Sequence, residues 1–375
     1  MHWEIVILVA VALLVSAALS PIVIAAGIPD APDPVRKMHK QVTPTSGGLA
    51  IAAGFALGLA VLFVGPWLHW RDELAPDMIG RVAMAAAFSF FMLAMGLADD
   101  IRPLDAKIKF GLIGAAALAA ALLMAHAEVL PIIGDISWNL GFTVGVIGSA
   151  LWLFTMINAT NFIDGANGLC MGQAAIGLLG LAAISQGAGA PDAAMLALAG
   201  AGGAVGFLIW NFPAGKIFAG DAGALFMGTV IGCAGLIAIQ DGGVSPFVLP
   251  ILFFPALGDV LLTLAWRLKR GRSLLHSHRD HLFQIGLRSK LGHARVALIY
   301  WALTAVCAVI AVAVDSLQRG GVGALETASG APGQSMLGYL ASGAPFIAWA
   351  VLSIVSVVIA IRVRAYARAH KLDAP

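Results

Sequence analysis

The sequence predicts an all-α integral membrane protein, a polytopic bundle of about eleven and at least ten transmembrane helices. Hydrophobic residues make up 60% of its 375 residues and charged residues only 11%, whereas soluble domains carry roughly 25% charged residues. The apolar runs are about 20 residues long without period-two alternation, so they fit membrane-spanning helices and not barrel strands. This composition excludes a soluble cytosolic enzyme, a disordered chain and a nucleic-acid-binding domain.

Eleven apolar segments can be counted along the chain. They lie at residues 5–27, 47–69, 81–98, 110–127, 141–157, 169–185, 193–210, 224–239, 247–265, 296–314 and 336–361. They leave room for loops only, so residues 1–375 are expected to form a single transmembrane domain. The first segment is expected to be a retained helix, because residues 1–4 contain no Lys or Arg and the run is too long for the apolar part of a signal peptide.

The basic residues orient the predicted bundle. Nineteen of the 22 Lys and Arg residues fall in one set of connections and in the C-terminal tail, and only Arg71, Arg81 and Arg319 fall in the other set. Positive charge favours the cytoplasmic side of a membrane. The N-terminus is therefore expected outside and the C-terminus in the cytoplasm, with the basic tail from Arg362 to Pro375 serving as an anchor and no more.

The two sets of connections also differ in chemistry. The outer connections, residues 128–140, 186–192, 240–246 and 315–335, are rich in Gly, Ala, Ser and Pro and are predicted to be plain turns. Polar and charged residues gather in five inner loops, at about residues 29–46, 99–109, 158–168, 211–223 and 266–295. An active site is therefore expected on the cytoplasmic face. The basic residues of the first loop, Arg36, Lys37 and Lys40, are also explained by topology alone.

Asp99 and Asp100 end an otherwise apolar helix in the second loop. Negative charge at the C-terminus of a helix opposes the macrodipole, so capping of that helix does not explain the pair. Acids at a membrane boundary are typical of a metal, proton or cation site. The alternative is a solvated helix end that is balanced by Arg102 and Lys107.

The third loop combines Asn158, Asn161, Asp164 and Asn167 with glycines and contains no Lys or Arg. A hairpin turn needs only one Asp-Gly or Asn-Gly pair. Glycine lets backbone amides approach an anionic ligand, Asn offers donors and acceptors, and an Asp without a basic neighbour suits Mg²⁺.

The fourth loop carries Asn211, Lys216, Phe218 and Asp221, the last between glycines at the start of an apolar helix. Asp221 is either an N-cap or a carboxylate that holds a divalent cation against a phosphate. Lys216 and the positive end of the helix would neutralise that phosphate. Phe218 is either a stacking platform for a planar group or an interfacial anchor.

The fifth loop contains three histidines within six residues, His276, His278 and His281, together with Arg279. No cysteine or suitably spaced carboxylate completes a zinc site, so an anion site of Arg and His is favoured over zinc and over a plain basic loop. The segment that leads into this loop contains several prolines and is expected to be kinked. Its Asp259 is the deepest acid in the chain and is expected to face the interior.

Taken together, the inner loops supply carboxylates for Mg²⁺ and cations for phosphate to one membrane face, which fits phosphoryl transfer to a lipid phosphate. Between residues 29 and 290, the sequence resembles the polyprenyl-phosphate N-acetylhexosamine-1-phosphate transferases. The resemblance rests on Asp99-Asp100 with Leu104 and Lys107, on Asn158-x-x-Asn161-x-x-Asp164-Gly165-x-Asn167-Gly168-Leu169, on Phe218-x-Gly220-Asp221-x-Gly223 and on Arg279-x-His281.

The resemblance implies a role for each matching residue. Asp221 would bind Mg²⁺, for which Mn²⁺ is a conceivable substitute, and Asp164 would lie beside the metal and the pyrophosphate. Asp99 and Asp100 would lie at the reacting phosphates, and one of them could deprotonate the lipid phosphate. The substrate-binding set would be Asn158, Asn161, Asn167, Asn211, Lys216, Phe218, Lys107, Arg279 and His278, with His281 as a catalytic group. Asn167, Asn211 and Phe218 would recognise uridine. A one-step attack and a two-step route through an aspartyl intermediate both remain open.

Two departures from the family pattern bear on the substrate. Ala224 stands where a Ser is expected, and His281-Leu-Phe283-Gln284 keeps only the first His of the usual histidine motif. The missing histidines argue against the phospho-MurNAc-pentapeptide branch and for the UDP-N-acetylhexosamine branch.

The expected donor is therefore UDP-GlcNAc, with a deoxy or otherwise modified UDP-HexNAc as the alternative. The acceptor would be undecaprenyl phosphate, and the setting a bacterial inner membrane and the first step of a cell-envelope glycan such as O-antigen. No nucleic-acid partner is expected, and a homodimer is left open. A secondary transporter is the alternative of another class, but transporters place charges near the bilayer midplane and often contain repeats, and this sequence shows neither.

Overall fold

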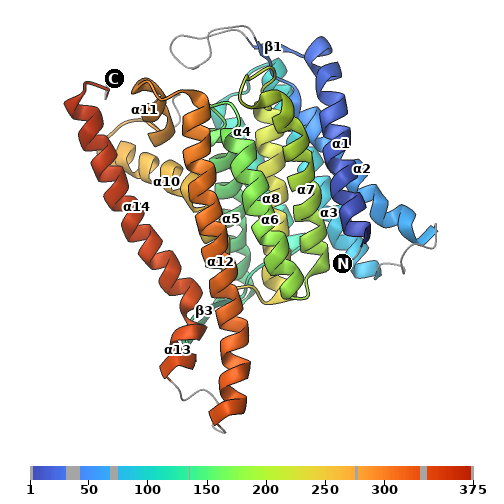
Figure 1. The fold of residues 1–375 in the computed structure, drawn as a ribbon, viewed down its shortest axis with the longest axis vertical. Helices are drawn as coiled ribbons and strands as arrows, with labels where there is room; N and C mark the ends of the chain where they lie inside the picture. Colours follow the sequence, from blue (N-terminus) through green and yellow to red (C-terminus); the bar gives the residue numbers. More distant parts are fainter. Residues whose placement is uncertain are drawn as a thin grey trace.

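The computed structural model describes residues 3–30, 43–67, 75–134, 136–274, 278–329 and 336–372, and shows a bundle of long helices (Figure 1). Of the residues singled out in the sequence, Arg36, Lys37, Lys40, Arg71 and His276 lie outside the described residues.

The first eight helices are α1 (Trp3–Ala26), α2 (Gly47–Trp67), α3 (Pro76–Ile101), α4 (Ala106–Leu123), α5 (Gly141–Ile163), α6 (Leu169–Gly187), α7 (Pro191–Asn211) and α8 (Gly220–Gly242). They are followed by α9 (Val248–Leu252), α10 (Phe254–Lys269), α11 (Leu282–Arg288), α12 (His293–Ser329), α13 (Met336–Ser342) and α14 (Ala344–Ala369). Two short antiparallel ribbons pair β1 (Pro29–Asp30) with β2 (Thr43–Pro44) and β3 (Val129–Ile133) with β4 (Ile136–Asn139).

The prediction of a polytopic helical membrane protein is confirmed. Ten helices of the described chain are long and apolar enough to cross a bilayer. The predicted segment 247–265 is not among them, because it is divided at Phe253 into α9 and α10. Pro255 lies in the first turn of α10, where a residue without an N–H group cannot continue the hydrogen bonding of a preceding helix. The kink expected from the prolines is therefore a full break.

The broken pair α9–α10 corresponds to the remaining apolar segment of the sequence, residues 247–265. The two ends of the chain lie at opposite ends of the bundle (Figure 1), which requires an odd number of crossings. Ten unbroken helices together with α9–α10 satisfy this requirement, in agreement with the eleven segments of the sequence.

Two predictions for the outer connections are wrong. Residues 128–140 are not a plain turn, because β3 and β4 form a hairpin there. Residues 315–329 are not a turn either, since α12 continues to Ser329. The continuation is supported by the ion pair between Asp315 and Arg319, one helical turn apart at 2.9 Å.

The interior of the bundle is built around α8. In its most apolar 18-residue stretch 94% of the residues are buried, against 11% for the peripheral α14. The helix is rich in Gly and Ala, which lets the backbones of neighbouring helices approach closely. It packs against α3, α5, α2 and α7, and its first turn therefore lies where several helix ends meet.

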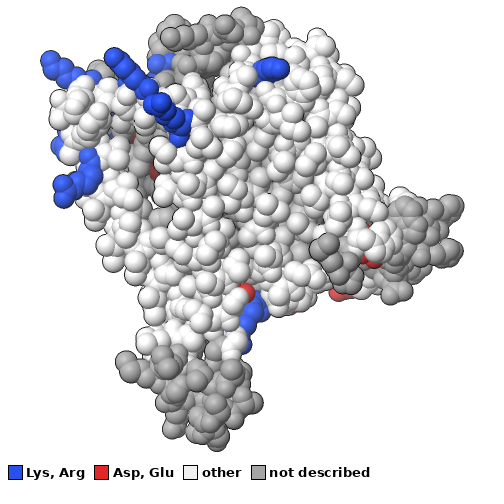
Figure 2. All heavy atoms as spheres, in the orientation of Figure 1, with Lys and Arg blue, Asp and Glu red and all other residues white. Residues whose placement is uncertain are grey.

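On the face that Figure 2 shows, the middle of the bundle is almost free of charged side chains, and Lys and Arg gather mainly at the end that carries α11 and the C-terminus. We call this end, where α3 and α5 finish and α8 begins, the site end.

Gly96 of α3 allows the closest approach to α8 and gives a test of this packing. A Cβ at Gly96 would lie 2.4 Å from the carbonyl oxygen of Asp221, whereas a Cβ at Gly80 of the same helix would meet nothing within 4 Å. Gly96→Ala is expected to lower the free energy of unfolding by about 1–3 kcal/mol through overpacking. Gly80→Ala is the matched control and should be neutral or stabilising by up to about 1 kcal/mol. Thermal unfolding in detergent measures both, and equal melting temperatures would contradict this account.

Candidate functional site

Acidic side chains from three helix ends converge at the site end. Asp99 and Asp100 lie in the last turn of α3, Asp164 follows the last residue of α5, and Asp221 lies in the first turn of α8. The sequence predicted a site made of these residues, and the packing of α8 against α3 and α5 brings them to one place.

Asp100 caps α8, a helix distant in sequence from its own. Its Oδ1 accepts a hydrogen bond from the Asp221 amide at 3.0 Å, and its Oδ2 accepts one from the Ala222 amide at 3.1 Å. The carboxylate thus opposes the macrodipole of α3 but binds the positive end of α8. Gly220 has a φ of +71°, and a Cβ there would lie 2.5 Å from Asp100 Oδ2. Glycine is therefore required beside the cap.

Asp221 consequently is not the N-cap of its helix, which was one of two interpretations of the sequence. Its side chain instead forms an ion pair with the Lys109 ammonium and accepts a hydrogen bond from Asn161 Nδ2 at 2.8 Å. The Lys109 Nζ also lies 2.7 Å from Asp99 Oδ2. Lys109, from the first turn of α4, therefore joins Asp99 of α3 to Asp221 of α8.

Lys109, and not Lys107, is the lysine of this loop that pairs with the acids, and the substrate contact predicted for Lys107 stays a prediction. Lys107 is exposed, and its backbone amide donates to the N-capping Asp105 at 2.9 Å. Asp105 fixes the start of α4, and Lys109 is then carried on the face that turns toward the acids. An N-cap at Asp105 was the signal in the sequence that could have distinguished the two lysines.

Asp164 adds a further carboxylate to this group. Burial, together with the negative charges of Asp221 and Asp100, raises the pKa of Asp164 to about 7. Among the described residues, Lys109 pairs with Asp99 and Asp221, and the first amides of α8 bind Asp100, but no ion pair to Asp164 is seen, so the group favours an added cation.

Asp164 and Asp221 offer carboxylate oxygens, the kind of ligand that Mg²⁺ prefers. The described residues contain no group of three His, Cys, Asp or Glu side chains placed to hold a metal ion. Mg²⁺ commonly takes one or two carboxylates and completes its shell with water and substrate phosphates. Asp221 and Asp164 are the residues that would hold it.

Three of the predicted asparagines hold the protein's own backbone. Asn158 Nδ2 donates to the Phe154 carbonyl at 2.7 Å, within α5. Asn167 Nδ2 donates to the Pro213 carbonyl at 3.1 Å. Asn211 accepts a hydrogen bond from the Gly168 amide and donates one to the Ile217 carbonyl. Asn167 and Asn211 therefore join the third and fourth loops, and Asn161 is the asparagine that reaches the acids.

Phe218 and Lys216 lie in the segment that joins α7 to α8. The Phe218 amide donates to the Pro44 carbonyl at 2.8 Å, and its carbonyl accepts a hydrogen bond from the Gly47 amide. These bonds join the fourth loop to the start of α2. Lys216 is exposed, and its ammonium lies 5.2 Å from the centre of the Trp210 ring.

The fifth loop places His281 against the end of α5. The His281 and Phe162 rings lie 6.2 Å apart, and the His278 ring lies 5.0 Å from that of His281. Asp259 accepts hydrogen bonds from the Leu282 and Phe283 amides at the start of α11. Asp259 is buried, as predicted, and so fixes the segment that carries His281.

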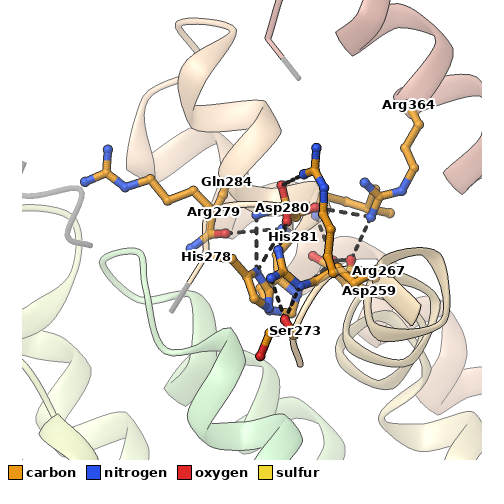
Figure 3. A network of polar contacts seen from close by, with 12 residues as sticks. Asp259, Arg267, Ser273, His278, Arg279, Asp280, His281, Gln284 and Arg364 are labelled. Atoms are coloured by element: carbon orange, nitrogen blue, oxygen red, sulfur yellow. Dashed lines mark hydrogen bonds and ion pairs between the residues drawn. The ribbon is translucent and has the colours of Figure 1, made fainter. Parts of the chain in front are cut away.

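The environment of His278 disfavours its protonated form. Burial and the nearby charges of His281 and Arg267 lower the pKa of His278 to about 4. Arg279 extends away from the paired histidine rings (Figure 3). An anion bound by this loop would therefore meet Arg279 as a cation and His278 as a neutral group.

The expectation that the C-terminal tail is an anchor and no more is wrong. Arg364 of α14 is buried and donates to Thr263 Oγ1 at 2.9 Å and to the Asp280 carbonyl at 3.2 Å. Nothing in the spacing of the tail distinguishes Arg364 from its basic neighbours. Its register on α14 relative to α10 is set by tertiary packing.

Fold and site together define a multi-pass membrane protein with an acidic, phosphate-compatible centre at one end of its bundle. Comparison with known proteins identifies the family. Residues 82–239 match the family model of glycosyl transferase family 4.

Three relatives illustrate the similarity. A probable undecaprenyl-phosphate N-acetylglucosaminyl 1-phosphate transferase of Bacillus subtilis is 28% identical over 84% of this chain and 86% of that protein. A decaprenyl-phosphate N-acetylglucosaminephosphotransferase of Mycolicibacterium smegmatis is 32% identical over 71% of this chain and 70% of that protein. A phospho-N-acetylmuramoyl-pentapeptide-transferase of Lactiplantibacillus plantarum is 29% identical over 73% of this chain and 84% of that protein. The chain belongs to glycosyl transferase family 4, a family of membrane transferases.

The pKa of Asp164 makes the stability of the metal-free protein depend on pH. The folded-state value of about 7 lies above the value of about 3.9 for an unfolded Asp, so the folded state favours the protonated carboxyl. The associated stability is present below about pH 4 and is lost as the pH rises through about 7. In EDTA, the wild-type melting temperature is expected to fall more steeply between pH 5 and pH 8 than that of Asp164→Asn. Identical pH dependence of the two proteins would contradict the raised pKa.

Proposed function

We propose that the chain transfers a phospho-N-acetylhexosamine, GlcNAc-1-phosphate in the first place, from a UDP-sugar to undecaprenyl phosphate and releases UMP. The observation that carries the proposal is the ion pairing of Lys109 with Asp99 and Asp221 at the site end. The site end thus holds one ammonium and several carboxylates at a position that a water-soluble donor and a membrane-bound acceptor can both reach. Such a set of groups suits phosphoryl transfer assisted by a cation.

The names of the relatives support the reaction type. The relatives from Bacillus subtilis and Mycolicibacterium smegmatis are named as transferases of N-acetylglucosamine phosphate, and both names include a polyprenyl phosphate. The relative of Lactiplantibacillus plantarum is named for a phospho-N-acetylmuramoyl-pentapeptide and has similar identity, so overall identity does not select the donor.

The histidine motif supports a UDP-HexNAc donor. His281 is followed by Leu282, Phe283 and Gln284, not by further histidines. Phe283 packs against Gly165, beside Asp164, and Gln284 accepts a hydrogen bond from the His281 amide at 3.2 Å. These two positions therefore support the loop. A deoxy or otherwise modified UDP-HexNAc is the alternative donor.

In the proposed reaction, an oxygen of the lipid phosphate attacks the β-phosphorus of the donor in line, and the bond from that phosphorus to the UMP oxygen breaks. Lys109 would neutralise phosphate charge between Asp99 and Asp221. Asp100 would position Asp221 by fixing the first turn of α8. Mg²⁺, when bound by Asp221 and Asp164, would supply further neutralisation of the pyrophosphate. One of Asp99 and Asp100 would take the proton of the lipid phosphate.

We propose further that the site end faces the cytoplasm of a bacterial inner membrane. Basic side chains gather at this end (Figure 2), which fits the distribution of positive charge in membrane proteins. UDP-sugars are made in the cytoplasm, so the donor would reach the site directly. The lipid-linked product would begin a cell-envelope glycan of the O-antigen type.

A panel assay tests the proposal. Purified protein in detergent receives undecaprenyl phosphate, Mg²⁺ and one UDP-sugar at a time, and UMP release is measured. Release is expected with UDP-GlcNAc, and it should be lost in EDTA and in Asp221→Asn. Release with another UDP-HexNAc alone would correct the donor. No release from any UDP-sugar by folded protein would refute the function and favour a transport assay.

Lys109→Gln is expected to lower kcat/KM by more than about a hundredfold, because the variant leaves Asp99 and Asp221 without their shared cation. Arg102→Gln is the matched control, since it removes one positive charge from the same loop at an exposed position. The control should stay within about twofold of wild type. Equal losses in the two variants would indicate a general effect of loop charge, and would overturn the specific role of Lys109.

A further inference from the structure

The helix that ends the chain reaches the loop that carries the predicted histidine motif. Arg364 of α14 is 5% exposed, and its guanidinium lies 4.1 Å from the centre of the Trp266 ring of α10. One of its terminal nitrogens donates to Thr263 Oγ1 and to the Asp280 carbonyl (Figure 3). A side chain from α14 thus binds the peptide that immediately precedes His281.

A second arginine binds the same aspartate from the other side. Arg267 at the end of α10 forms an ion pair with the Asp280 side chain, and the two side chains are 8% and 10% exposed. Its Nε also donates to the Ser273 carbonyl at 3.1 Å. Arg267 therefore holds the start and the end of the loop together, and Arg364 ties that loop to α14.

The position of His281 depends on these contacts. Its backbone amide donates to Gln284, and its Nδ1 lies 3.5 Å from Asp259 Oδ1. Its ring packs between those of Phe162 and His278. A shift of the Asp280 peptide would move the ring relative to the end of α5 and would also move Arg279.

We propose that Arg364 is a positioning residue for the transfer reaction: it fixes the Asp280 peptide and so sets the placement of His281 and Arg279 toward the donor. This inference rests on the proposed function. Arg364 lies outside residues 82–239, the range that the family model matches, and outside all motifs of the inner loops.

The chemistry of the contact requires arginine. A planar guanidinium can stack on Trp266 and still donate in its own plane to two acceptors, and it stays charged when it is buried. Lysine would retain the charge and could donate from its ammonium, but it would lose the guanidinium plane that stacks on Trp266. A Lys variant should therefore restore part of the function that a Gln variant loses.

The test compares Arg364→Gln and Arg364→Lys with Arg368→Gln. Arg368 lies one turn further along α14 and is exposed, so the control removes the same charge from the same helix. Steady-state UMP release is measured per amount of folded protein, with the UDP-sugar and the polyprenyl phosphate varied separately. Tryptic cleavage of the loop, which contains Arg270, Arg272 and Arg279, is followed in the same samples as a readout that needs no activity.

Arg364→Gln is expected to lower kcat/KM for the UDP-sugar by at least about tenfold, since small displacements of contacting groups are costly to catalysis. The KM for the polyprenyl phosphate should stay within about twofold, and tryptic cleavage should accelerate by at least about threefold. Arg364→Lys should recover part of both losses, and Arg368→Gln should match wild type. If Arg364→Gln does not fold, Thr263→Val removes one acceptor and should show a smaller loss of the same kind.

Three results would overturn the inference. Unchanged kinetic constants in Arg364→Gln, with or without faster cleavage, would make the residue an anchor of α14 only. Equal losses in Arg368→Gln would indicate an effect of tail charge. Equal rises in both KM values would indicate general loosening of the site. No UMP release by wild-type protein is a different result, which refutes the proposed function and the positioning role with it.

Discussion

The mutual repulsion of carboxylates in an apolar bundle is the constraint on which the rest of the site depends. Asp99, Asp100, Asp164 and Asp221 come from three helix ends and can approach one another only if their charge is offset. Lys109 does so for Asp99 and Asp221, and the positive end of α8 does so for Asp100. The remaining charge is borne by Asp164 and makes the group receptive to a divalent cation.

The same structural device occurs twice at this end of the bundle. Asp100 binds the first amides of α8, and Asp259 binds the first amides of α11. In each case an acid from one helix fixes the start of another helix at a predicted functional residue, which is Asp221 in the first turn of α8 and His281 immediately before α11. Buried amides need acceptors, and these acids supply them across the packing interface.

The sequence predicted the helical class and about eleven crossings, because apolar run length and composition are local properties of a chain. It predicted the convergence of Asp99, Asp100, Asp164 and Asp221 because they lie in loops on one side of the bundle and match motifs of the family. It did not predict that Lys109 pairs with the acids or that Arg364 is buried, because both depend on the register of one helix against another. The turns expected at 128–140 and 315–335 were wrong for a related reason. Glycine and alanine permit turns, but pairing in β3–β4 and helix continuation in α12 decided between the available conformations.

The burial of α8 has a consequence for how such a protein can diversify. Asp221, the carboxylate proposed to hold the metal, lies in the first turn of α8, the most buried of the candidate spans. A shift of Asp221 would therefore require shifts in the helices that pack around α8. The His281 loop is held instead by α10 and the peripheral α14, through contacts of single side chains. A substitution at this rim can therefore move His281 and Arg279 while the contacts among the four acids stay in place, so the two parts of the site can vary separately in geometry.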